Sequence, residues 1–84
     1  MRVINLDSLN PGEFATIRAI NADDGLHQRM SALGFRVGKR VELVRRARFH
    51  GPLHVRLGAT DVILRRTEAR RIQISQEIAE ALHP

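Results

Sequence analysis

The sequence contains no cysteine, no tryptophan and no tyrosine, and Lys39 is its one lysine. Without cysteine the chain forms no disulfide, offers no thiolate to a metal and has no thiol nucleophile. It has no run of about 20 apolar residues, which a membrane-spanning helix requires, and polar residues interrupt the first 20 positions, where a signal peptide carries its apolar segment. We therefore expect a cytoplasmic protein that meets a membrane only through a partner.

The motifs of common catalytic and nucleotide-binding sites are also missing. The chain has neither the phosphate-binding loop G-x-x-x-x-G-K-[ST] nor the nucleophile turn G-x-S-x-G. The adjacent Asp23 and Asp24 would point about 100° apart on a helix, so they suit helix capping better than a catalytic dyad. We predict that the protein is not an enzyme, has no catalytic residues and needs no cofactor.

Charge of one sign is in excess, because the net charge is +5 and nearly all the cationic residues are arginine. A basic surface suits nucleic acid or anionic lipid, and a solvated surface is the simpler interpretation. Nucleic-acid binders usually add aromatic stacking platforms, but the aromatic residues here are Phe14, Phe35 and Phe49 alone. Nucleic acid is therefore an improbable partner, and a small basic barrel that binds it is kept as an alternative function.

Short apolar runs separated by turn signals dominate the 84 residues, a pattern typical of one small all-β domain. Full closure of such a sheet removes its unpaired edges, which favours a small barrel. Thr67–Ala69 is expected to form a single helical turn. The expected strands are Val3–Leu6, Phe14–Ile20, Val41–Ala47, Leu53–Leu57, Val62–Arg65 and Ile72–Ile74.

One segment has the period of a helix instead. Leu26, Met30 and Leu33 recur at i, i+4 and i+7 and form one apolar stripe, so we expect them to be largely buried. Gly34 follows at once and suits the left-handed position that ends a helix. The sequence predicts a helix over Gly25–Leu33, packed over one opening of the barrel. A short C-terminal helix is expected after Ser75, which divides the chain into a barrel (1–75) and a helical tail (76–84).

Two histidines are candidates for a metal site. His50 and His54 bracket the turn Gly51-Pro52, so their side chains are able to converge. A zinc or iron site needs three or four ligands, and no cysteine or acidic residue is near this pair in sequence. Solvated histidines are the simpler interpretation.

The segment between the third and fourth strands contains the candidates for partner binding. Phe49 falls outside the alternating pattern of both strands and sits beside Arg48. Exposed aromatic and arginine side chains often carry most of the energy of protein contacts. The alternative is that Phe49 folds back and plugs the barrel end. Leu26 is the next candidate, because a first-turn residue can lie at the rim between core and solvent.

The order of these features resembles the FeoA family over about residues 3–74. The resemblance rests on three stretches: Leu6-x-x-Leu9-x-x-Gly12-Glu13-x-Ala15-x-Ile17, Leu26-x-x-Arg29-Met30-x-x-Leu33-Gly34-Phe35-x-x-Gly38-x-x-Val41, and Leu64-Arg65-Arg66-x-Glu68-Ala69-x-x-Ile72-x-Ile74. The chain departs from the family pattern at Gly58-Ala59-Thr60-Asp61. The SH3-like C-terminal domain of metal-dependent repressors is a similar module, and such a regulatory module is a second alternative function.

The resemblance implies a mainly β fold, a small SH3-like β-barrel of five to six strands with one short α-helix and a short C-terminal helix. It also implies a non-catalytic cytoplasmic helper of bacterial ferrous iron uptake. Its partner would be FeoB, the membrane protein with a GTPase domain that imports Fe²⁺.

Overall fold

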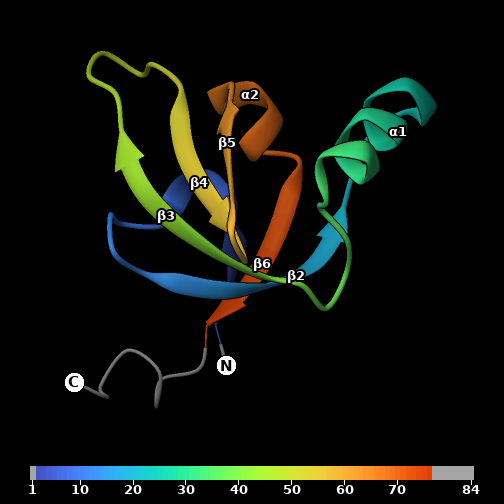
Figure 1. Cartoon of the computed structure of the whole chain (residues 1–84), viewed down its shortest axis with the longest axis horizontal. Helices are drawn as coiled ribbons and strands as arrows, with labels where there is room; N and C mark the ends of the chain where they lie inside the picture. The colour runs from blue at the N-terminus through green and yellow to red at the C-terminus, as the bar shows by residue number, and fades with distance from the viewer. Residues whose placement is uncertain (1, 77–84) are drawn as a thin grey trace.

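The computed structural model describes residues 2–76, and these form one antiparallel sheet with short helices at its margins (Figure 1). The strands are β1 (Arg2–Asn5), β2 (Phe14–Ile20), β3 (Arg40–Arg46), β4 (Leu53–Leu57), β5 (Thr60–Leu64) and β6 (Ile72–Gln76). The helical elements are the 3₁₀ turn η1 (Leu6–Ser8), α1 (Asp24–Leu33) and α2 (Arg66–Ala69). The expected elements are thus present, with boundaries that differ by one or two residues, and the C-terminal helix falls on residues outside the described part.

The sheet has the order β1-β6-β2-β3-β4-β5 and is strongly curved (Figure 1). Every neighbouring pair is antiparallel, and β1 and β5 are the two edges. The sheet therefore curls around a core without pairing its first strand to its last, and the small-barrel prediction holds in this open form.

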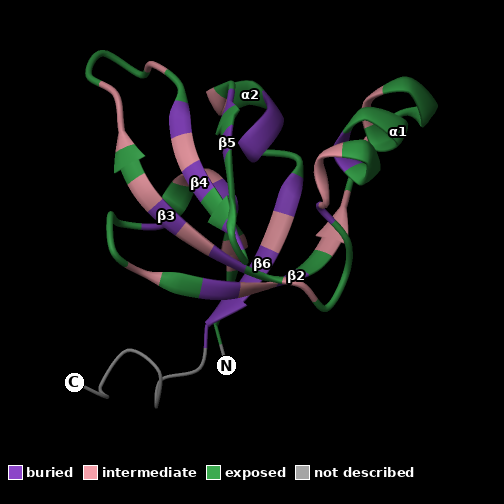
Figure 2. Ribbon diagram, in the orientation of Figure 1, coloured by how far each residue is buried: buried purple, intermediate pink, exposed green. Residues whose placement is uncertain are grey.

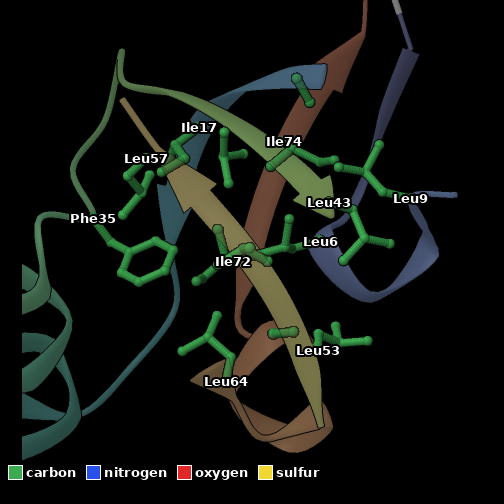
Figure 3. Packing of buried hydrophobic residues seen from close by; sticks show 14 of the residues in the cluster. Leu6, Leu9, Ile17, Phe35, Leu43, Leu53, Leu57, Leu64, Ile72 and Ile74 are labelled. Carbon is green, nitrogen blue, oxygen red and sulfur yellow. The ribbon is translucent and has the colours of Figure 1, made fainter. Parts of the chain in front are cut away.

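Apolar side chains that alternate along the strands fill the inside of the curl (Figures 2 and 3). In β4 the buried residues are Leu53, Val55 and Leu57, while the residues between them face outward. Phe35 enters the same core from the turn after α1. The core is Leu6, Leu9, Ala15, Ile17, Met30, Phe35, Val41, Leu43, Leu53, Val55, Leu57, Val62, Leu64, Ala69, Ile72 and Ile74.

Helix α1 begins and ends as the sequence predicts. The Asp23 side chain accepts a hydrogen bond of 2.9 Å from the backbone N–H of Leu26, which caps the first turn. Gly34 has φ 101° and ψ 3°, the left-handed conformation that glycine adopts without steric penalty.

The expected burial of the α1 stripe is only partly correct. Met30 is buried, but Leu26 and Leu33 are half-buried and pack at the margin of the core. Figure 1 shows the reason, because α1 lies beside the curled sheet rather than inside it. The stripe is therefore covered at its centre and open at both ends.

Candidate partner-binding loop

The loop between β3 and β4 is tightly closed and points away from the sheet (Figure 1). The N–H of Ala47 donates to the carbonyl of Pro52 at 3.0 Å, and the N–H of Gly51 donates to the carbonyl of Arg48 at 3.1 Å. A Cβ on Gly51 would lie 2.9 Å from the Cβ of Ala47 and 3.0 Å from the carbonyl oxygen of Arg48. Only glycine fits this approach, so the residue type at position 51 sets the loop shape.

Two consecutive side chains in this loop adopt a left-handed backbone. Phe49 has φ 57° and His50 has φ 60°, and they are the only non-glycine residues with positive φ between residues 2 and 76. Each such residue costs roughly 1–2 kcal/mol. Residues held in this region often cluster at functional sites, and here they are adjacent.

The Phe49 side chain projects from the tip of the loop. It is 95% exposed, more than any other large apolar residue in the described part of the chain. The alternative that Phe49 plugs the barrel end is therefore wrong, because the core closes on Leu53 and the residues around it without this ring. The loop presents an aromatic side chain to solvent at the expense of backbone strain.

The arginines beside this loop divide into two kinds. Arg48 and Arg45 are exposed, and neither side chain has a bonding partner among residues 2–76. Arg46 is different, because its guanidinium donates to the backbone carbonyl of Asp7 at 2.8 Å and also to that of Leu9. Arg46 therefore holds β3 against the segment from Asp7 to Leu9, whereas the Arg48 side chain makes no such bond within residues 2–76.

Leu26, the other candidate for partner binding, lies on α1 at the opposite side of the molecule from this loop (Figure 1). It is half-buried against the core. Arg48 and Phe49 are neighbours in sequence and share this loop, and the fold keeps Leu26 apart from them.

The two candidate metal ligands have separate partners. His50 Nδ1 accepts from the guanidinium of Arg66, whereas His54 Nε2 lies 2.9 Å from a carboxylate oxygen of Asp61. No group of three or more histidine and acidic residues suited to a metal occurs among residues 2–76. No acidic residue is near this pair in sequence, but strand pairing brings Asp61 beside His54.

Asp61 is a partner of His54 that the sequence analysis did not identify. This strand begins at Thr60 rather than at the expected Val62, so Asp61 lies in β5 directly opposite Arg56, whose Nε donates to it at 2.7 Å. The hydrogen bond from Arg56 and then that from His54 lower the pKa of Asp61 to about 2. The available signal was the short Gly58-Ala59 turn, which sets the register of the hairpin.

Known proteins are similar to this chain in sequence and in fold. The FeoA domain family model matches residues 4–76, and curated protein sequences provide no match. The zinc complex of FeoA from Stenotrophomonas maltophilia, an SH3-domain protein, has 28% identity and a TM-score of 0.75 over 92% of this chain and 93% of that one. No helix within residues 2–76 is long and apolar enough to cross a membrane.

Two further structures are similar over only part of their own length. The iron(II) transport protein A of Clostridium thermocellum has 29% identity and a TM-score of 0.82, over 86% of this chain and 44% of that one. A manganese-dependent transcriptional repressor has 21% identity and a TM-score of 0.80, over 89% of this chain and 42% of that one. The likeness to the repressor is one of fold alone, and the chain spans less than half of either protein.

Proposed function

The chain belongs to the FeoA family, and from that membership we propose that it is a non-catalytic accessory protein that docks on a FeoB-type membrane GTPase transporter. Membership supports a role in ferrous iron transport, and the fold is SH3-like. In this proposal the protein acts in the cytoplasm and modulates the transporter. It hydrolyses no nucleotide itself, because the sequence has no phosphate-binding loop.

The observation that carries the docking proposal is the exposure of Phe49. A large apolar ring that is 95% exposed gains nothing from folding, and its backbone conformation adds strain. Burial of the ring in a pocket of a partner would remove its apolar surface from water. Arg48 beside it adds a guanidinium that has no partner within residues 2–76, and this pairing of aromatic and arginine is typical of interface hot spots.

The test is a binding measurement between this protein and the detergent-solubilised FeoB-type transporter of the same organism. The informative variant is Phe49→Asn, because asparagine tolerates the left-handed region and keeps the loop conformation. We expect binding to weaken about tenfold or more, as for a hot-spot aromatic residue. The matched control is Val37→Asn, which removes another exposed apolar side chain in a different loop and should leave affinity unchanged.

Two results would count against the proposal in different ways. Absence of any binding by the parent protein would remove the transporter as its partner. Normal binding by Phe49→Asn together with loss of binding by Leu26→Ala would keep the partner and place the docking surface on α1.

A further inference from the structure

An open hollow lies between the β3–β4 loop and the start of α2, and we propose that it binds a phosphate group. Its volume is about 430 Å³, which is within the usual range for small-molecule sites. The lining residues come from two segments that are distant in sequence: His50, Gly51, Pro52, Arg65, Arg66 and Thr67. Phe49 does not line it, so this proposal does not rest on the docking role of that ring.

Positive charge around the hollow exceeds negative charge. The carboxylate of Asp7 is the nearest counter-charge to Arg66, with Oδ2 3.8 Å from Nε. The same oxygen also lies 3.3 Å from Nε of Arg70, so this one carboxylate forms ion pairs with two guanidinium groups. Arg65 is exposed and its side chain has no partner among residues 2–76. Arg65, Arg66 and Arg70 thus carry three positive charges against the one carboxylate of Asp7, an excess of two positive charges.

Arg66 has hydrogen-bonding capacity to spare. Its side chain is only 25% exposed, and its Nε is buried without a hydrogen-bond partner in the described part of the chain. One terminal nitrogen donates to Nδ1 of His50. Buried polar groups are rarely left unsatisfied, and a guanidinium with unused donors beside a hollow fits an incoming oxyanion.

Phosphate matches this site better than a single carboxylate does. A phosphate group carries about −1.5 to −2 charges at neutral pH, which balances the excess around the hollow. Its oxygens accept from arginine in the bidentate geometry that guanidinium favours. The hydroxyl of Thr67 on the same wall is a further donor.

The experiment is an NMR titration of the full chain with inorganic phosphate at constant ionic strength. The backbone amides of His50, Gly51, Arg65, Arg66 and Thr67 and the Arg66 Nε–H are observed, with acetate as a parallel titrant. We expect saturable shifts at these positions with phosphate and at least about tenfold weaker binding of acetate. Arg66→Gln should weaken phosphate binding about tenfold or more.

Arg66 also lies near Asp7, so its variant requires a companion that leaves the fold intact. Arg65→Gln changes an exposed side chain and should weaken phosphate binding several-fold. The matched control is Arg71→Gln, an exposed arginine outside the hollow, which should change affinity by less than about twofold. Equal losses in Arg65→Gln and Arg71→Gln would show that only net charge matters and would overturn the site.

A final comparison separates free phosphate from lipid phosphate. Vesicles of phosphatidylcholine with and without phosphatidic acid are added to the labelled protein. Saturable binding of inorganic phosphate at the hollow supports the proposal, whether or not the vesicles also bind. Binding to acidic vesicles without any response to inorganic phosphate would overturn it in favour of a general basic membrane surface, and equal binding of acetate would overturn the assignment to phosphate.

Discussion

The guanidinium of Arg29 on α1 donates to the buried carboxylate of Glu68 on α2, although the two residues are 39 positions apart in sequence. The same carboxylate accepts the backbone N–H of Arg65 at 2.9 Å. Glu68 therefore caps α2 and joins it to α1, and its charge is compensated at a site that is 8% exposed.

Removing this charge pair should destabilise the fold. Arg29→Met keeps the aliphatic part of the side chain and leaves the Glu68 carboxylate with one donor. We expect a loss of about 1–2 kcal/mol in the free energy of unfolding, less than for a fully buried pair because Arg29 is half exposed. Urea denaturation measures it. Arg18→Met is the control, and equal stability of the two variants would contradict a structural role for the pair.

Gly34 should resist substitution for reasons of backbone conformation alone. A Cβ at this position would meet only the Cδ1 of Leu57 at an ordinary 3.7 Å. Gly34→Ala therefore measures the cost of the left-handed backbone conformation and not the cost of a steric clash. We expect a loss of about 1–2 kcal/mol on thermal or urea denaturation. Gly25→Ala, inside α1 and without positive φ, should instead leave stability unchanged or raise it by up to about 1 kcal/mol. The explanation fails if both variants behave alike.

Phe49→Ala should leave the stability of the isolated protein nearly unchanged, within about 0.5 kcal/mol, because the ring contributes no buried surface. A buried phenylalanine would lose about 3–5 kcal/mol on the same change. Phe35→Ala, at a fully buried position, is the matched comparison. Differential scanning calorimetry distinguishes these outcomes, and a large loss in Phe49→Ala would mean that the ring is packed in solution.

Asp61 should give acid stability a specific pH dependence. Its pKa is lowered to about 2 in the fold, from an ordinary 3.8, chiefly by the hydrogen bond from Arg56. A lowered carboxyl pKa stabilises the fold above the unfolded value, and this contribution is lost as pH falls from about 4 to about 2. Asp61→Asn should therefore be less stable than the parent above about pH 4, and the difference between their free energies of unfolding should shrink as the pH falls to about 2. The carboxyl ¹³C shift reports the pKa directly, and a midpoint near 3.8 would refute the pairing.

The local pattern of the sequence was sufficient for most of the secondary structure. Alternation predicts β4 because Leu53, Val55 and Leu57 must share one buried face. Asp23 and Gly34 mark the ends of α1 because capping and left-handed φ depend on single residue types. In β2 the period of two would place Ala19 on the buried face of Ala15 and Ile17. Ala19 is only half-buried, because the pairing of β2 with β6 shifts between Ile17 and Ala19.

Only the tertiary structure decided which charged residues meet and that Phe49 is left outside the core. Three contacts join segments that are distant in sequence: Asp7 with Arg66, Arg29 with Glu68, and His50 with Arg66. Such pairs leave no periodic signal, because periodicity records which face of one element is buried and not what lies opposite. Phe49 lies in a loop, where no period applies, so its exposure followed from a core already filled by other side chains. Burial depends on the whole packed chain, whereas helix and strand formation depend largely on near neighbours.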